Sequence, residues 1–360
     1  MLAARFYGAS DIRLEHVSDP VPRAGEALIE VRAAGICGSD LHRYRGQDPW
    51  GGGAAGPRTF GHELSGVVIE LGPGSEGLET GQRVAVEPAQ LTGCGDCRVC
   101  RRGSANLCPR RPPGVRSSAG FGERDVAPVD RLHPMAANLS LEATALTDLY
   151  ACAIHAAHRI PVGPEATALI LGSGPMALAL GQVVRLSGAR AILAGRRQGA
   201  LELATRAGAA DAAIDVSSPD FAAQIAGLTD GEGPDVVFEA AGGVSGETLK
   251  LAIRAVAPGG TVGVVGAFVG DVVVPYREAN RKEVTLRWSN GFGVWNGLRE
   301  FRMALDWIAD GRLQASSLIT HRYPLRQIGL AFETAADKAR SGAMKVIVLP
   351  AAAGAEECHA

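Results

Sequence analysis

Residues 166–188 read ATALILGSGPMALALGQVVRLSG: a short apolar run, a glycine-rich turn, and then apolar residues at helical spacing. This order predicts a buried strand that leads directly into a helix. The glycines let the backbone turn tightly and approach a bound group closely. The free N–H groups at the start of the helix would then face a pyrophosphate. We therefore expect a dinucleotide-binding turn in which Ala177 replaces a third glycine, formed by Gly172, Gly174, Pro175 and Met176.

The same alternation of strand and helix patterns continues through PDVVFEAAG (234–242) and TVGVVGA (261–267). Strands and helices that alternate at this pace predict βαβ units and a doubly wound parallel sheet of the Rossmann type. Residues before about 150 show short alternating runs separated by turn signals, as in EALIEVRAAG (26–35), and predict an antiparallel β domain. We thus expect an α/β protein with a first domain at 1–150, a dinucleotide-binding domain at 151–287 and a C-terminal part at 288–360.

The composition is that of an ordinary globular protein of 360 residues, 46% apolar and 21% charged, which is long enough for two domains. Its formal net charge is −2, so the charge does not favour nucleic acid or an anionic membrane as a partner. Glycine, proline and charged residues interrupt every apolar stretch before it reaches the length of a secretion signal or a membrane span. We therefore expect a cytoplasmic protein whose thiols stay reduced.

Four of the seven cysteines lie in GCGDCRVCRRGSANLC (93–108). Clustered cysteines in a reducing compartment are more often metal ligands or redox groups than disulfides. The two-residue spacings suit four thiolates around one tetrahedral zinc ion, a closed site with a structural role. An iron–sulfur cluster is an alternative, although the last gap is seven residues rather than three, and four unliganded thiols are another. We expect a structural zinc lobe at about 93–109, held by Cys94, Cys97, Cys100 and Cys108.

The second strand of the predicted dinucleotide-binding domain ends at Gly195 and is followed by Arg196 and Arg197. In NAD-binding domains an Asp or Glu near this point binds the ribose hydroxyls, but no acidic residue occurs between Glu165 and Glu202. A carboxylate would repel a 2′-phosphate, whereas a glycine followed by guanidinium groups leaves room for one and pairs with it. The sequence therefore favours NADP(H) over NAD(H), with two solvated arginines as the alternative interpretation.

Three further segments carry residues that ligate metals: AAGICGSDLH (33–42), FGHELSG (60–66) and ALTDLYACAIHAA (145–157). Each segment alone is typical of structural residues, since a cysteine in a β domain is usually a small buried apolar side chain. Together they offer a thiolate, an imidazole and carboxylates, a set that holds zinc with its fourth position open. The candidate residues are Cys37, Ser39, His42, His62, Glu63 and Asp148.

With these segments in this order, the chain resembles the zinc-containing medium-chain dehydrogenases, the family of alcohol, sorbitol and threonine dehydrogenases. The resemblance covers almost the whole length and rests on GICGSDLH, GHELSG, the four-cysteine lobe, GSGPMA, DVVFEAAG and LITHRYPL (318–325). It implies a β-rich, GroES-like catalytic domain made of 1–150 and 288–360, with the Rossmann domain inserted between these two parts.

The resemblance assigns Cys37 and His62 as ligands of a catalytic zinc ion, with Glu63 as a near ligand that exchanges with water. Asp148 falls where sorbitol dehydrogenases carry Glu and classical alcohol dehydrogenases carry Cys. An Asp at this place is similar to the bacterial NADP-dependent secondary alcohol dehydrogenases, as is the Gly-Arg-Arg end of the second strand. Those enzymes usually lack a complete structural zinc lobe, which this chain has, so the sequence combines features of two subgroups.

The same resemblance implies which residues handle the substrate. Ser39 would pass the substrate proton onward and His42 would carry it to solvent, with a surface histidine as the alternative for His42. TLRWSNGF (285–292) resembles the substrate-arginine region of polyol dehydrogenases, which places Arg287 and Trp288 at the substrate and Tyr44 in its pocket. Arg287 in an ordinary salt bridge is the alternative. The substrate stays open between a polyol, a cyclitol and a simple secondary alcohol.

The main hypothesis is a zinc-dependent oxidoreductase that interconverts a small alcohol and its ketone or aldehyde by hydride transfer with NADP(H). It would hold two zinc ions per chain, one catalytic and one structural. The alternatives are an NAD-dependent dehydrogenase of the sorbitol or threonine type, a metal-free quinone or enoyl reductase, and a non-catalytic protein that senses nucleotides. Family precedent and the open edge of the sixth strand predict a homodimer or homotetramer.

Overall fold

The computed structural model describes residues 1–47, 58–111, 119–160 and 162–350. Among the helices of these residues, none is long and apolar enough to cross a membrane.

The chain forms two compact units. The first contains Met1–Asp148, Phe301–Asp310 and Ile319–Ala360, and the second contains Leu149–Glu300 and Gly311–Leu318. The first unit thus takes in both an N-terminal part and a C-terminal part of the chain, as the α/β fold with an inserted domain requires.

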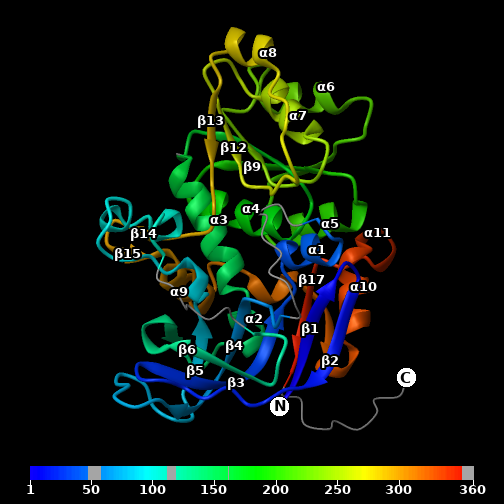
Figure 1. Cartoon of the computed structure of the whole chain (residues 1–360). Coiled ribbons are helices and arrows are strands. Elements are labelled where there is room, and N and C mark those ends of the chain that lie inside the picture. The colour runs from blue at the N-terminus through cyan, green and yellow to red at the C-terminus, as the bar shows by residue number, and fades with distance from the viewer. Residues whose placement is uncertain (48–57, 112–118, 161, 351–360) are drawn as a thin grey trace. The chain divides into compact units, whose positions relative to one another are not determined.

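Within the described part of the second unit, six strands form one sheet in the order β10-β9-β8-β11-β12-β13 (Figure 1). All five pairings between neighbours are parallel. This is the strand order of a Rossmann dinucleotide-binding sheet, whose order reverses between the first strand, β8, and the fourth, β11. The predicted doubly wound sheet is therefore confirmed. Its strands are β8 (Thr167–Leu171), β9 (Arg190–Gly195), β10 (Ala212–Asp215), β11 (Val236–Glu239), β12 (Thr261–Val264) and β13 (Thr285–Trp288).

Helices connect these strands, and the helix α4 packs on β8 and β9 while α7 packs on β11 and β12 (Figure 1). The helix α3 begins in the first unit and continues into the second. The remaining elements from here to residue 318 are α3 (Thr147–Arg159), α4 (Pro175–Leu186), α5 (Gln198–Arg206), α6 (Phe221–Leu228), α7 (Glu247–Ala255), α8 (Tyr276–Arg281), β14 (Val294–Trp295), β15 (Leu298–Arg299), α9 (Glu300–Ala309) and the 3-10 turn η5 (Ala315–Leu318).

The helix α4 starts at the glycine-rich turn. Gly174 is its N-cap in an extended conformation, with Pro175 in the first turn. Proline suits this place because its fixed φ fits the helix and its missing N–H would have no partner there. Residues 177–184 of α4 are all buried, and the helix packs on β8 and β9, so packing holds its N-terminus directly after β8.

In the described part of the first unit, a seven-stranded sheet has the order β16-β17-β3-β4-β5-β7, with β6 also paired to β3. Its pairings are antiparallel except that between β16 and β17. The C-terminal strand β17 pairs with β3, where Ile347 lies opposite Gly35, so the end of the chain closes the sheet begun near the N-terminus. The strands are β3 (Glu26–Gly35), β4 (Glu63–Leu71), β5 (Arg83–Val86), β6 (Arg124–Pro128), β7 (Leu132–Pro134), β16 (Ile319–Pro324) and β17 (Lys345–Leu349), with a separate hairpin of β1 (Leu2–Gly8) and β2 (Asp11–His16).

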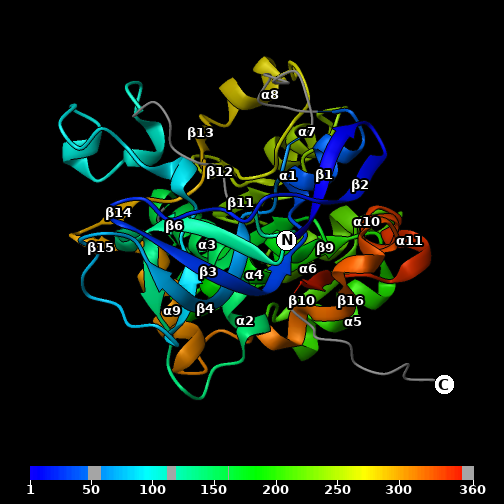
Figure 2. The same ribbon diagram turned by 60° about the horizontal axis from the view of Figure 1, so that its bottom comes forward.

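Helices and aromatic side chains cover this sheet. The helix α2 lies along β3 and β4 (Figure 2). Phe60, Phe121 and Phe332 form an aromatic cluster in the core, with ring centroids 5.0 to 5.5 Å apart. The helices are α1 (Gly38–Tyr44), α2 (Leu141–Ala145), α10 (Ile328–Ala336) and α11 (Lys338–Ser341), with 3-10 turns η1 (Ala89–Leu91), η2 (Cys100–Arg102), η3 (Ala105–Leu107), η4 (Val129–Arg131) and η6 (Leu325–Gln327).

The second unit continues beyond residue 287, to Glu300. The buried Glu300 carboxylate is 2.7 Å from His155 Nδ1 and 2.8 Å from His158 Nδ1, and it accepts the Gly293 N–H at 2.7 Å. Although burial by itself raises the pKa of Glu300, the hydrogen bonds from the two histidines lower it to about 2. This ionised carboxylate ties the β14–β15 hairpin to α3, which explains why the hairpin stays with the second unit.

A prediction concerns Gly66 in β4, which lies against the bulged part of β3. A Cβ at this position would overlap the Glu30 carbonyl oxygen and stand 2.6 Å from Ile29 Cγ2. We expect Gly66→Ala to lower the free energy of unfolding by about 2–3 kcal/mol, because the backbone of β3 must move. Gly329→Ala is the matched control in the same unit, since nothing lies within 4 Å of its Cβ and it is in a helix. Urea unfolding should show that control to be neutral or slightly more stable.

Candidate active site and metal centres

Cys37 stands at the N-terminus of α1, directly after β3. It is the N-cap of the helix, and the Asp40 carboxylate accepts the Cys37 backbone N–H at 3.0 Å. This arrangement is a capping box, which fixes the angle at which the chain enters the helix. The Cys37 thiol is therefore positioned by local backbone geometry.

His62 and Glu63 lie at the start of β4, next to the end of β3. The Glu63 carboxylate is fully buried and forms an ion pair with Lys345 of β17. Lys345 is also buried, and its ammonium donates to the Ile36 carbonyl at 3.1 Å. Because Gly35 has no side chain, the Glu63 carboxylate has room beside β3. A buried carboxylate thus faces the metal-ligating residues with a buried cation on one side.

The structure brings Cys37, His62 and Glu63 together: the Cys thiol, one His nitrogen and one Glu oxygen all lie within 4.8 Å of one another. Two atoms that bind one zinc ion at about 2.0–2.3 Å are at most about 4.6 Å apart, so a small adjustment suffices. The Glu63 Oε1 atom is buried without a hydrogen-bond partner among the described residues. A buried carboxylate oxygen without a partner is costly, and a metal ion would satisfy it. The donor set therefore fits zinc.

The electrostatics of His62 follow from its neighbours. Burial by itself lowers the pKa of His62, but the Cys37 thiolate and the carboxylates of Asp40 and Asp148 raise it well above its ordinary value. The His62 Nδ1 atom is 3.8 Å from Asp40 Oδ1, and its Nε2 atom is 3.9 Å from Asp148 Oδ2. These negative groups surround one imidazole, and a divalent cation bound there would neutralise their charge.

Asp148 lies at the start of α3, close to His62 but outside the group of three whose ligand atoms are mutually within 4.8 Å. Burial raises the pKa of Asp148 to about 7, with the negative Glu63 adding to the effect. A carboxyl group with this pKa changes charge near neutrality unless a cation holds it ionised. Its role as a metal ligand stays a prediction.

Ser39 and His42 are both on α1. The Ser39 hydroxyl is buried and has no hydrogen-bond partner among the described residues. A buried hydroxyl group normally has a hydrogen-bond partner, and a bound molecule would supply one for Ser39. Tyr44 ends the same helix, and its ring packs at a centroid distance of 5.4 Å on Phe332 of α10. The structure thus places the ring of Tyr44 against the core of the first unit.

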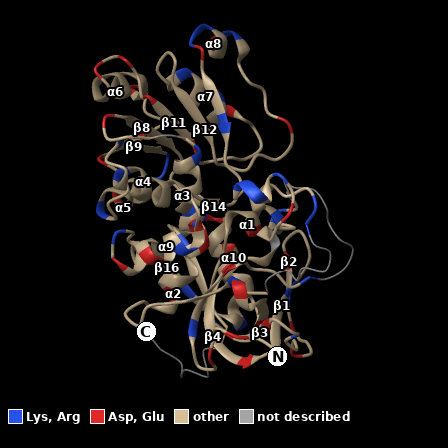
Figure 3. Cartoon of the chain, turned by 90° about the vertical axis from the view of Figure 1, so that its left-hand side faces the viewer, with Lys and Arg blue, Asp and Glu red and all other residues tan. Residues whose placement is uncertain are grey.

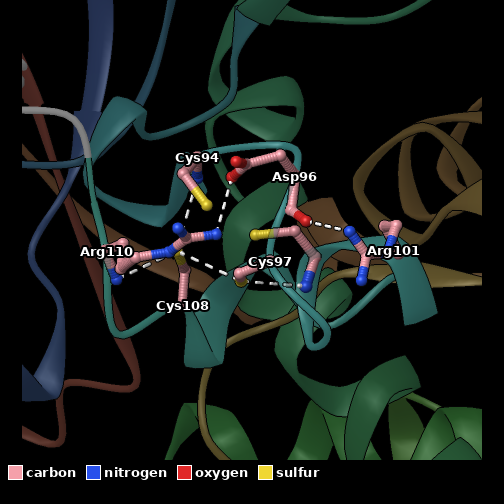
Figure 4. Close-up of polar contacts among 7 residues, drawn as sticks. Cys94, Asp96, Cys97, Arg101, Cys108 and Arg110 are labelled. Carbon is pink, nitrogen blue, oxygen red and sulfur yellow. Dashed lines mark hydrogen bonds and ion pairs between the residues drawn. The ribbon is translucent and has the colours of Figure 1, made fainter.

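The four-cysteine lobe brings all four thiols within 4.8 Å of one another: Cys100 is in the turn η2, Cys108 directly follows η3, and the other two cysteines are in the loop before η2. The Cys97 and Cys108 sulfur atoms are 3.8 Å apart, and the Cys94 and Arg110 backbone N–H groups point to Cys108 Sγ at 3.3 Å (Figure 4). A Cβ at Gly93 would overlap the Cys100 sulfur, so only glycine fits there.

The four thiols of the lobe differ in pKa: those of Cys97 and Cys108 are lowered, and those of Cys94 and Cys100 are raised. The Cys100 backbone N–H lowers the pKa of Cys97 to about 6, whereas burial raises the pKa of Cys100 to about 12. A common metal ion would hold both as thiolates. The Arg110 guanidinium pairs with Asp96 at 2.9 Å beside the sulfur atoms (Figure 4). Four converging sulfur donors, with no open position, fit a closed zinc site.

In the second unit, the predicted turn lies at the carboxyl end of β8. Gly172 has φ +137°, and its N–H donates to the Ala194 carbonyl at 2.8 Å, which brings the turn beside the end of β9. Gly174, Pro175 and Met176 then start α4. Gly195 ends β9, and a Cβ there would stand 2.6 Å from Ser173 Oγ. Any side chain at 195, an acidic one included, would therefore collide with the glycine-rich turn.

The two arginines after Gly195 differ in their surroundings. Arg197 is half-buried and its guanidinium donates to the Ser173 carbonyl, and burial lowers its pKa. The Arg196 side chain is exposed and contacts no hydrogen-bonding or charged group of the described residues. One guanidinium thus braces the turn while the other is available to a ligand.

Arg287 and Trp288 are on β13, the edge strand of the six-stranded sheet. The Arg287 guanidinium donates to the Arg159 carbonyl at the end of α3 at 2.9 Å, and Trp288 is exposed. Within the second unit, Arg287 therefore has a carbonyl partner rather than the carboxylate that a salt bridge would need.

Sequence reasoning missed Asp40 and Lys345. The signal for Asp40 was present, because an acidic residue three positions after an N-cap is a capping box. The sequence holds no comparable signal for Lys345. This residue is in an apolar strand, and it contacts Glu63 only because β17 pairs with β3.

Comparison with known proteins agrees with this geometry. Residues 23–137 match the alcohol dehydrogenase GroES-like domain, and residues 175–310 match the zinc-binding dehydrogenase family. A sorbitol dehydrogenase of Halalkalibacterium halodurans is 30% identical over 349 residues, which cover 96% of this chain and 97% of that protein.

Solved structures are similar over the whole length. A zinc-binding dehydrogenase of Sinorhizobium meliloti bound to NADP superimposes with a TM-score of 0.85 at 30% identity, covering 97% of this chain and 99% of that one. An Escherichia coli alcohol dehydrogenase complexed with NADH has a TM-score of 0.85 at 27% identity, with coverages of 97% and 99%. The chain belongs to the zinc-containing medium-chain dehydrogenase family, and it is a zinc-dependent, NAD(P)-linked alcohol or polyol dehydrogenase.

The buried ion pair gives a testable prediction. Replacing Lys345 with methionine leaves Glu63 buried without its cation, so the free energy of unfolding of the zinc-free protein should fall by about 3–5 kcal/mol. The double variant Glu63→Gln with Lys345→Met should recover at least half of that loss, because no buried charge remains. Urea unfolding of the three proteins measures both effects. A single variant within about 1 kcal/mol of the parent would contradict the assignment.

Proposed function

We propose that this enzyme uses Cys37, His62 and Asp148 to hold a catalytic zinc ion, with Glu63 as an exchangeable neighbour, and that it prefers NADP(H). The observation that carries the proposal is the convergence of a thiol, an imidazole and a buried carboxylate beside a second acid, Asp148. Zinc held there supplies Lewis-acid polarisation of an alcohol or carbonyl oxygen, which favours hydride exchange with the nicotinamide.

The chain's own residues would fix the ligands and move the proton. Asp40 Oδ1 is 3.8 Å from His62 Nδ1 and would help to orient the imidazole, which would leave Nε2 to bind the ion. Lys345 pairs with the Glu63 carboxylate. Without that cation, Glu63 would compete more strongly with the substrate for the ion. With Cys37, His62 and Asp148 as ligands, the fourth position of the ion would be left for the substrate.

Ser39 is proposed to take the substrate hydroxyl proton. Its buried hydroxyl lacks a partner among the described residues, and a substrate oxygen would supply one. His42 lies three positions further along α1, on the same side of the helix, and would carry the proton outward.

A second zinc ion is proposed in the four-cysteine lobe, with a structural role. The four sulfur donors support this because they leave no position open for a substrate. An iron–sulfur cluster would use the same donors, so metal content decides between them.

Preference for NADP(H) rests on Gly195, Arg196 and Arg197. Ser173 excludes a carboxylate at position 195, and the exposed Arg196 would pair with a 2′-phosphate. The alternative is NAD-linked polyol oxidation of the sorbitol dehydrogenase type.

The substrate is proposed to be a polyol, a cyclitol or a secondary alcohol, by analogy with the sorbitol dehydrogenase relative. Contact of Tyr44, Arg287 and Trp288 with the substrate stays a prediction. A homodimer or homotetramer is likewise proposed, supported by the exposed Trp288 on the edge strand β13. The free thiols recorded among the described residues suit a cytoplasmic location.

Metal content tests the two zinc sites. The parent protein, purified without chelator, should carry two zinc ions and no iron per chain. Cys37→Ser should keep one zinc ion and lose activity about 100-fold or more, because Lewis-acid stabilisation is worth several kcal/mol.

Cys100→Ser should also keep one zinc ion, but its main effect should be a lower melting temperature. Cys152→Ser is the control, since Cys152 lies outside both groups of ligands, and it should keep two. Iron in the parent protein, or a Cys37→Ser variant that keeps both zinc ions, would overturn the proposal.

Coenzyme binding tests the phosphate pocket. NADPH should bind more tightly than NADH, and Arg196→Ala should weaken NADPH binding about tenfold while changing NADH binding less than about twofold. Arg277→Ala, an exposed arginine of α8, is the matched control and should change neither. Tighter binding of NADH to the parent protein would make NAD-linked oxidation the better assignment.

A further inference from the structure

Glu239 is the last residue of β11, which lies between β8 and β12 in the six-stranded sheet (Figure 3). The strand order reverses between β8 and β11. Glu239 is paired with Leu171 of β8, the residue directly before the glycine-rich turn, and with Val264 of β12. A dinucleotide binds across a doubly wound sheet at this reversal, outside the carboxyl ends of the strands. Glu239 is therefore at the end of the sheet that would face the coenzyme.

The Glu239 carboxylate is fully buried, and no basic side chain compensates its charge in the described part of the chain. The other buried glutamates of the described residues each have a basic side chain at ion-pair distance; they are Glu63, Glu87 and Glu300. The Oε2 atom of Glu239 also has no hydrogen bond to any described residue. Burial raises the pKa of Glu239, so its ionised form is disfavoured. Since a buried acid without a cation is costly, stability alone does not explain a glutamate at this position.

The other carboxylate oxygen holds the loop that follows β11. Glu239 Oε1 accepts the Ala241 N–H at 3.0 Å and the Gly242 N–H at 2.8 Å. Gly242 has φ +63°, and a Cβ there would stand 2.3 Å from the Ala267 carbonyl oxygen. The same carbonyl accepts the Gly243 N–H at 2.9 Å. The loop after β11 is therefore fixed by Glu239 on one side and by the loop after β12 on the other.

Both loops and the glycine-rich turn are in contact around this carboxylate. A Cβ at Gly266, in the loop after β12, would stand 2.5 Å from Glu239 Oε2. A Cβ at Gly172, in the glycine-rich turn, would stand 3.1 Å from the Ala240 carbonyl oxygen. A change in the conformation of Glu239 would therefore move the backbone that surrounds the turn.

The place of this charge matters for the nicotinamide end of the coenzyme. The proposed 2′-phosphate pocket at Gly195 and Arg196 follows β9, so the opposite half of the coenzyme would extend toward β11 and β12. The nicotinamide ring is cationic when oxidised and neutral when reduced. A buried carboxylate acts strongly on a nearby cation, because little water screens the interaction. It would act weakly on the neutral ring.

We propose that Glu239 is a positioning residue of the coenzyme site. Its carboxylate holds the loops after β11 and β12 in place, and its charge favours the oxidised form of the coenzyme over the reduced form. This inference rests on the proposed coenzyme position at the glycine-rich turn.

Two substitutions separate the position of the side chain from its charge. In Glu239→Gln, the amide oxygen accepts the same two N–H groups, but the side chain carries no charge. In Glu239→Ala, both the acceptor and the charge are removed. The matched control is Glu232→Gln, the same chemical change at an exposed glutamate before the amino end of β11.

Calorimetry on the full-length, zinc-loaded enzyme measures the Kd of the oxidised and reduced forms of whichever coenzyme the parent protein binds more tightly. Glu239→Gln should weaken binding of the oxidised form about fivefold and change binding of the reduced form less than about twofold. Glu239→Ala should weaken binding of both forms about tenfold, because the loop after β11 loses its acceptor. Glu232→Gln should change neither Kd.

The glutamine variant decides the outcome. The proposal is overturned if Glu239→Gln changes both Kd values by the same factor, leaves both unchanged, or does not fold by circular dichroism. A folded Glu239→Ala variant that binds both forms as the parent does would overturn it as well. A parent protein that binds neither coenzyme would contradict the proposed coenzyme site itself, which distinguishes that failure from an error about Glu239.

Discussion

The ion pair between Glu63 and Lys345 is the interaction around which the first unit is organised. Two opposite charges are removed from water at the point where β3, β4 and β17 meet, next to the thiol of Cys37. Neither charge is tolerable there alone, because an unpaired buried ion costs several kcal/mol. The pair therefore requires the C-terminal strand to close the sheet that the N-terminal strands begin. The same contact sets the charge beside the candidate metal ligands.

The candidate sites of the two units use different kinds of donor group. In the first unit, side chains supply the donors: thiol, imidazole and carboxylates converge from α1, β4 and α3. In the second unit, the backbone would supply them, because the first N–H groups of α4 follow the glycine-rich turn and have no partner within the helix. A site made of side chains depends on which residues the fold brings into contact. Backbone sites depend on where a side chain is absent, as at Gly195 beside Ser173.

Buried charge explains the unusual protonation behaviour of the candidate metal centre. Asp40, Glu63 and Asp148 crowd around His62, and burial raises the pKa of Asp40 and Asp148. Such a cluster is unfavourable for a protein that keeps it without a cation. A divalent ion would offset the repulsion among these carboxylates. The cluster therefore supports the proposed metal centre over an ordinary core.

The sequence alone determined the features that depend on neighbours along the chain. The spacing of four cysteines, the glycine-rich turn after a strand, and the alternation of strands and helices predicted the lobe, the turn and the doubly wound sheet. Each of these is local, because turns, strands and helix starts are specified within a few residues. The sequence also showed that position 195 carries no carboxylate. It did not show that the Ser173 side chain leaves no room for one there.

Only the tertiary structure decided which distant residues share an environment. Lys345 donates to the carbonyl of Ile36 although 309 positions separate them, and no pattern in an apolar strand reveals that contact. Long-range pairing sets burial, and burial sets the charge that a side chain can carry. The sequence could therefore name the candidate ligands, while the fold alone shows what surrounds them.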